Sequence, residues 1–163
     1  MGTNTGGTLL WWRQFLGFGS DGVRKAVEIL SDQYVDAARD AARLKQEAQR
    51  MQYPQFRDKL LAIAAQRANH ADLLSKKLES LNGRVPRVAQ VAPTDKNSWQ
   101  YLLEELDEQQ RDAAELSLEA RELQPEMPEI ARLLERILED GKVQRAAIRE
   151  MLMKSDPQSG YSA

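Results

Sequence analysis

The chain has 163 residues, of which 29% are charged and 6% aromatic; its formal net charge is −2 and it has no cysteine. One domain with a proper core fits this length, and the abundance of Ala, Leu, Glu, Arg and Gln favours long helices over sheets. The lack of cysteine excludes disulfides, thiolate zinc sites and a cysteine nucleophile, and the lack of a basic block argues against nucleic-acid binding. The lack of cysteine also fits a cytoplasmic protein. No apolar run approaches the roughly 20 residues that span a bilayer.

Residues 1–19 predict a separate N-terminal arm. Residues 1–8 are small and polar, whereas residues 9–18 (LLWWRQFLGF) predict a short apolar helix. Glycines follow this helix, and Ser20 or Asp21 can cap the first long helix.

The short apolar helix places four large side chains on one side: Trp11, Trp12, Phe15 and Leu16. Burying one such side chain is worth about 1.5–3 kcal/mol, so these residues should pack against something. Three destinations remain open: one end of the chain's own bundle, a partner protein, or a membrane interface.

The following residues predict four helices, because apolar residues recur there at steps of three or four. The expected helices cover residues 22–51, 54–81, 98–123, and the stretch from the turn at 124–128 to about Lys154. Pro54 and Pro128 mark two short turns. Residues 155–163 predict a loose tail.

Residues 84–97 contain two prolines and no helical period. Fourteen extended residues reach over about 40 Å, which is about the length of a 28-residue helix. This connection can therefore span the length of the bundle, so that the third helix starts at the opposite end and runs parallel to the second. The expected fold is all-α: an antiparallel four-helix bundle over residues 20–154, made of two hairpins joined by a long crossover.

The second helices of the two hairpins superpose under a shift of 74 residues. The matched pairs are Pro54 and Pro128, Leu60 and Leu134, Ile63 and Ile137, Leu74 and Ile148, and Leu78 and Leu152. The same shift matches His70 with Gln144, so each hairpin has a polar residue in its apolar stripe.

Short loop, long crossover and short loop is a known four-helix topology. With helices of this length the chain resembles the ferritin-like family, and its rubrerythrin-type branch in particular. The resemblance rests on residues 63–74 (IAAQRANHADLL), 102–106 (LLEEL) and 111–115 (RDAAE), and it covers residues 22–154.

Working members of that family hold two metal ions with one Glu from each of helices 1 and 3 and Glu-x-x-His from each of helices 2 and 4. Carried onto this chain, the resemblance places these positions at Asp36, Arg67, His70, Gln110, Gly141 and Gln144. At best His70 and Asp36 remain as ligands. Because iron or manganese needs several carboxylates, we expect no metal cofactor. We expect Arg67, His70, Gln110 and Gln144 to form a polar core network instead.

Plainer roles stay open for each of these residues. His70 can be a hydrogen-bonded core histidine rather than a ligand, and Arg67 can form an ion pair or extend out of the bundle along its aliphatic stem. Gln110, Ser117 and Gln144 can be tolerated polar core positions.

These observations favour a non-catalytic bundle, because no Ser/His/Asp arrangement and no phosphate-binding loop can be argued. We expect a scaffold or accessory subunit that docks through its Trp-rich arm on a partner protein, or self-associates, without nucleotide or nucleic acid. One alternative is an iron- or manganese-binding protein with ligands completed by Asp36, Glu108, Glu115 or a second chain. Another is a cytoplasmic bundle attached to a membrane surface through the arm, or held in a larger complex.

Overall fold

Four helices make up most of the part of the chain that the structure describes. The computed structural model describes residues 7–155, with side chains described from residue 21 onward. The helices are α1 (Gly7–Arg50), α2 (Pro54–Ser80), α3 (Ser98–Leu123) and α4 (Pro128–Lys154). No strand occurs among the described residues, so the all-α, four-helix prediction is confirmed. Within the same residues no helix is long and apolar enough to cross a bilayer.

Local sequence explains where the helices begin and end. Pro54 and Pro128 are the first residues of α2 and α4. Proline has no N–H, and at the start of a helix no hydrogen bond is lost because the first N–H groups have no partner within the helix. Asn97 caps α3, because its side chain accepts from the N–H of Gln100 at 2.9 Å while the Gln100 side chain accepts from the N–H of Asn97. Asn82 takes a left-handed φ of 58° just after α2.

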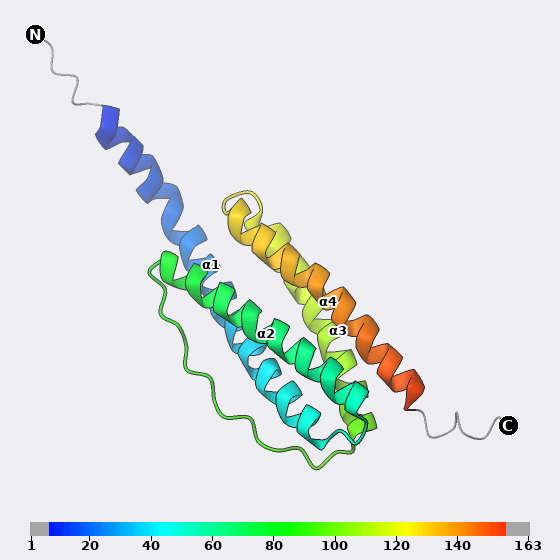
Figure 1. Ribbon diagram of the computed structural model, residues 1–163. Helices are drawn as coiled ribbons and strands as arrows, with labels where there is room; N and C mark the ends of the chain where they lie inside the picture. Colours follow the sequence, from blue (N-terminus) through cyan, green and yellow to red (C-terminus); the bar gives the residue numbers. More distant parts are fainter. Residues whose placement is uncertain (1–6, 156–163) are drawn as a thin grey trace, which may run out of the picture.

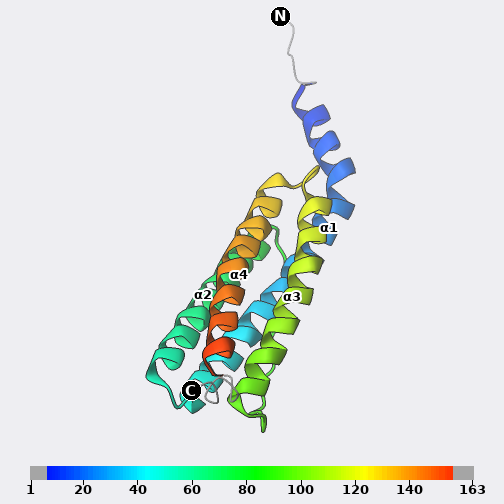
Figure 2. The ribbon, with the colours of Figure 1, turned by 90° about the vertical axis from the view of Figure 1, so that its right-hand side faces the viewer.

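α1 begins earlier than the sequence predicted. It runs from Gly7 through three glycines to Arg50, so the structure describes neither a separate short helix nor a start at Ser20 or Asp21. Glycine weakens a helix by about 1 kcal/mol relative to alanine but keeps its N–H, unlike proline. The first turns of α1 extend past the ends of the other helices (Figures 1 and 2).

α1 and α2 form one hairpin and α3 and α4 form a second, and the two hairpins lie against each other (Figure 1). Residues 81–97 run back along the first hairpin and lead into α3. Two side chains of α1 hold this connection: Gln46 donates to the carbonyl of Val91 at 3.1 Å, and Arg50 donates to the carbonyls of Thr94 and Lys96 at 2.9 and 2.7 Å.

Side-chain bonds between the hairpins show how the helices are aligned. α2 and α4 are joined, in order along α2, by Lys59–Glu150, Gln66–Gln144, His70–Asp140 and Lys77–Glu129. The residue numbers of the partners fall along α4 as they rise along α2, so these two helices run in opposite directions. α1 and α3 are joined in the same opposed order by Lys25–Glu122, Gln33–Glu119 and Arg43–Glu105.

The apolar core is divided into two clusters. One gathers residues such as Leu30, Leu74, Leu123 and Leu134 near one end of the bundle. The other gathers Leu44, Leu60, Leu102, Ile148 and further residues toward the opposite end. The buried polar residues of α2 and α4, His70 and Gln144, lie in the stretches between the two clusters. The fold therefore places a polar layer at mid-depth.

The burial pattern repeats between the hairpins. Under the shift of 74 residues, the buried set Phe56, Leu60, Ile63, His70 and Leu74 meets the buried set Ile130, Leu134, Ile137, Gln144 and Ile148. The repeat seen in the sequence is therefore also a repeat in which side chains face inward.

Candidate functional site

His70 and Gln144 lie in the polar layer, each 2% exposed and each bonded to the other hairpin. His70 Nε2 lies 2.8 Å from Asp140 Oδ2, and Gln144 Nε2 donates to Gln66 Oε1 at 2.8 Å. Burial lowers the pKa of His70, against the opposing effect of the bond to Asp140. A neutral imidazole that donates from Nε2 to Asp140 fits this environment. The plainer interpretation of His70, a hydrogen-bonded core histidine, matches this arrangement.

The buried amide of α3 is Gln109, whereas the predicted network residue Gln110 is exposed. Gln109 donates to Glu105 Oε1 at 2.8 Å. The prediction was one residue off because Gln110 continued the stripe by steps of four. The sequence did contain the correct signal: Leu102, Gln109, Leu116 and Leu123 are spaced by seven and share one face.

On α1, Asp40 faces inward at the polar layer, at 4% exposure, rather than the predicted Asp36. Asp36 is half-buried and pairs with Arg39 on its own helix at 2.8 Å. The pKa of Asp40 is raised to about 7, mainly by burial and also by the nearby Glu105, while Arg67 opposes the shift. The sequence analysis missed Asp40 because it judged the stripe by apolar residues alone.

Arg67 is partly exposed and lines a small hollow of about 30 Å³ in the polar layer. The hollow is also lined by Asp36, Asp40, Gln109 and Asp112. Arg67 lies near enough to lower the pKa of both Asp40 and Asp112 against the effect of burial. Of the four predicted network residues, the structure therefore brings Arg67, His70 and Gln144 into the layer and leaves Gln110 outside.

A line of polar side chains, all but one of them carboxylates, runs between α1 and α3; we call it the acidic seam. Its members are spaced by seven along each helix: Gln33, Asp40 and Glu47 on α1, and Glu105, Asp112 and Glu119 on α3. Burial raises the pKa of Glu119 to about 7, although Gln33 donates to it at 2.8 Å. Carboxylates packed this closely need a cation to remain charged.

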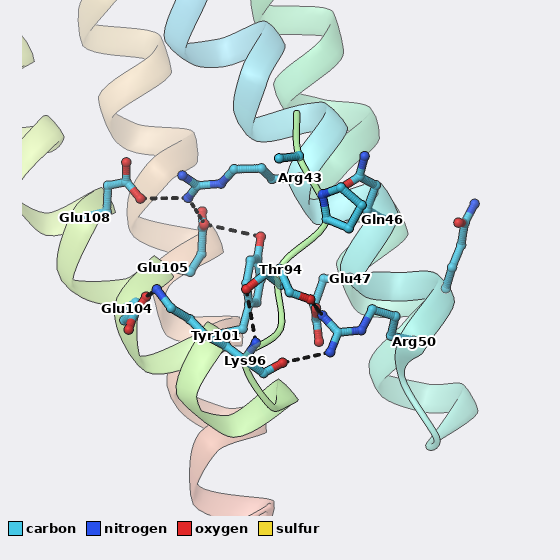
Figure 3. A pocket seen from close by; sticks show the side chains of 13 residues that line it. Arg43, Gln46, Glu47, Arg50, Thr94, Lys96, Tyr101, Glu104, Glu105 and Glu108 are labelled. Carbon is cyan, nitrogen blue, oxygen red and sulfur yellow. Dashed lines mark hydrogen bonds and ion pairs between the residues drawn. The ribbon is translucent and has the colours of Figure 1, made fainter. Parts of the chain in front are cut away.

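Arg43 supplies that cation at one end of the seam (Figure 3). Its Nη2 lies 2.6 Å from Glu105 and 2.7 Å from Glu108, so a single guanidinium joins α1 to two carboxylates of α3. Glu105 is 1% exposed and also accepts from Gln109 and, at 3.4 Å, from the hydroxyl of Tyr101. The hydrogen bond from Arg43 lowers the pKa of Glu108. This buried cluster was not predicted.

A cavity of about 470 Å³ lies beside this cluster, between α1, α3 and residues 92–96 (Figure 3). Pockets for small ligands have this size. Its charged walls, however, are already paired: Arg43 with Glu105 and Glu108, Arg50 with Glu47, and Lys96 with Glu104. The pair of Lys96 with Glu104 holds the connecting segment against α3, and all of these pairs leave few free groups for a ligand.

The residues present do not fit the di-metal centre that the family resemblance implies. At the six corresponding positions, Arg67 places a fixed positive charge and Gly141 and Gln144 offer no carboxylate. The residues proposed to complete the set lie elsewhere, because Glu108 is paired with Arg43 and Glu115 is exposed. Among the described residues no three His, Asp or Glu side chains are arranged to hold an ion.

The predicted docking residues Trp11, Trp12, Phe15 and Leu16 lie outside the part of the chain whose side chains are described. Their packing stays a prediction. Comparison of the chain with protein-family models, with curated proteins and with solved structures finds no match.

Replacing Arg43 by alanine should destabilise the protein by about 3 kcal/mol or more, because the buried Glu105 loses its cation. Chemical unfolding measures the change. The matched control is Arg39→Ala, which removes only a partly exposed pair with Asp36 and should change stability by less than about 1 kcal/mol. Equal effects of the two variants would contradict the role of Arg43.

Asp40→Asn should stabilise the protein at pH 8 by about 1–3 kcal/mol and much less at pH 5. The pKa of Asp40 is about 7 in the folded protein, so the folded state binds a proton more tightly than the unfolded state does. The stability of the wild type therefore falls as pH rises from about 4 to above 7. Asparagine removes that dependence. Unfolding curves at both pH values test this, with the exposed Asp107→Asn as control. A gain that is the same at pH 5 and pH 8 would rule out this role for Asp40.

Proposed function

We propose that the protein is a non-catalytic bundle of ferritin-like topology that serves as a scaffold or accessory subunit. The observation that carries this proposal is the polar layer: Arg67, Gly141 and Gln144 stand where a working member has acids and histidine, and α3 contributes the buried amide Gln109 to the layer. Two hairpins, a long connecting segment and opposed side-chain pairs between the hairpins support the topology.

The docking element of this proposal is the apolar segment of residues 9–18. Its sequence carries Trp11, Trp12, Phe15 and Leu16, and the backbone of α1 there projects beyond the other helices (Figure 2). Four large apolar side chains on a projecting helix are costly to expose to water. A partner protein with an apolar groove is the occupant that we propose, since amphipathic helices bind such grooves through side chains one turn apart. A cytoplasmic location belongs to the same proposal.

A photo-reactive residue at position 12 should cross-link one specific protein, and Trp11→Ser with Phe15→Ser should abolish that cross-link. The variant should keep the wild-type helical content and unfolding midpoint, because the bundle core is elsewhere. The matched control is Met153→Ser, which changes an exposed apolar residue on α4. Flotation with liposomes that depends on residues 9–18, without a cross-linked protein, would favour the membrane alternative and overturn the proposal.

Purified protein incubated with Fe²⁺ or Mn²⁺ and then desalted should hold far less than one ion per chain, because the inward residues offer too few carboxylates. Elemental analysis measures the content. Near-stoichiometric metal that is lost in His70→Ala, and kept in the control Asp58→Ala on the exposed surface of α2, would replace the scaffold proposal with the metal-binding alternative.

A further inference from the structure

An apolar groove of about 470 Å³ lies at the end of the bundle opposite the projecting part of α1 (Figure 1). Its walls come from both hairpins: the turn between α1 and α2, the start of α3, and Ser155 just after α4. Buried Phe56 and Leu102 are among its lining residues, together with the rings of Tyr53 and Trp99, which are 56% and 39% exposed. Large apolar side chains exposed together in one groove favour a group that covers them.

A second depression of about 350 Å³ continues this groove, because Tyr53 and Phe56 line both. Its other side is basic, since Lys59 and Lys154 line it. These two lysines share one carboxylate, that of Glu150, at 2.9 and 2.6 Å. No acid is among the described residues that line either depression. Two ammonium groups with one carboxylate between them favour a further acidic group at this corner.

The chain leaves α4 between these two depressions. α4 ends at Lys154, which lines the second depression, and the next residue, Ser155, lines the groove. Residues 156–163 (DPQSGYSA) therefore start at the rim of the groove. From Ser155 to Tyr161 an extended chain reaches up to about 20 Å, which is enough to cross a groove of this volume.

Residues 156–163 carry the groups that such a groove can hold. Tyr161 is their one aromatic residue, and aromatic rings pack favourably edge to face. Tyr53 and Phe56 already pack in this way, with ring centroids 5.5 Å apart. Asp156 is the one acid of the segment and supplies the carboxylate that the lysine corner favours. The segment therefore matches both the aromatic and the basic part of the surface.

The apolar part of the N-terminal arm cannot cover this groove within one chain. At 1.5 Å per residue, α1 carries Trp12 about 57 Å away from Arg50, which lines the groove. A second copy could bring its arm, but a segment tethered by a short linker has an effective concentration of about 1 mM. Below that protein concentration, residues 156–163 therefore outcompete a second copy of equal affinity.

We propose that residues 156–163 fold back over the end of the bundle and seat Tyr161 between Tyr53 and Trp99. The seated segment joins the two hairpins, because the walls of the groove belong to both. It also closes this groove to other partners. A docked segment thus replaces the loose tail that the sequence predicts. The inference goes beyond docking through residues 9–18 and does not rest on it.

Fluorescence of Trp99 tests this in the full chain. Trp11→Phe with Trp12→Phe leaves Trp99 as the only tryptophan, because the chain has three. In this parent, Tyr161→Ser should make acrylamide quench Trp99 about twofold more strongly, because the ring loses its cover. The matched control is Gln158→Ser, which alters a polar residue of the same segment and should be quenched like the parent. Protection in the parent should be the same between about 1 and 100 µM protein, because the contact lies within one chain.

A photo-reactive residue at position 161 gives a second measurement, in a chain that keeps its own tryptophans. It should cross-link within one chain to the peptide that contains Tyr53 or Trp99, and this measurement serves if the tryptophan variants do not fold. Circular dichroism confirms that each variant is folded. Equal quenching in the parent and in Tyr161→Ser, protection that grows with protein concentration, or cross-links to a second molecule would each overturn the proposal.

Discussion

The contact between Arg43 and the buried Glu105 is the interaction on which the joining of the two hairpins depends. α1 and α3 meet along the acidic seam, where Asp40, Glu47 and Glu105 are almost fully buried. Burying carboxylates is costly unless each has a cation or hydrogen-bond donors. Arg43 provides five donors in a fixed fork and reaches two glutamates of α3 at once.

The polar layer also determines how the second helices are aligned. Apolar clusters at the two ends of the bundle supply most of the stabilising burial, but leucine and isoleucine contacts tolerate small shifts between helices. Gln66–Gln144 and His70–Asp140 do not, because a slip of one turn along α2 would separate both pairs. Buried polar groups that lose their partners are strongly destabilising, so these pairs favour a single register.

The same layer links the fold to the proposed role. Positions that could face a metal ion carry an arginine, two amides and a glycine, and the histidine that remains is bonded to Asp140. In the structure, His70 and Gln144 form hydrogen bonds between α2 and α4. The surface that we propose for docking is the first part of α1, which projects beyond the other helices.

The sequence alone determined the four helices, the prolines that open two of them, and the repeat that pairs His70 with Gln144, because these follow from spacing and local backbone chemistry. It did not determine that Gln109 rather than Gln110 faces inward, that Asp40 rather than Asp36 is buried, or that Arg43, Gln66 and Asp140 supply the partners. Spacing places residues around their own helix, and neighbours differ by only about 100°. How each helix is rotated against the others depends on packing across the bundle, which only the tertiary structure decides.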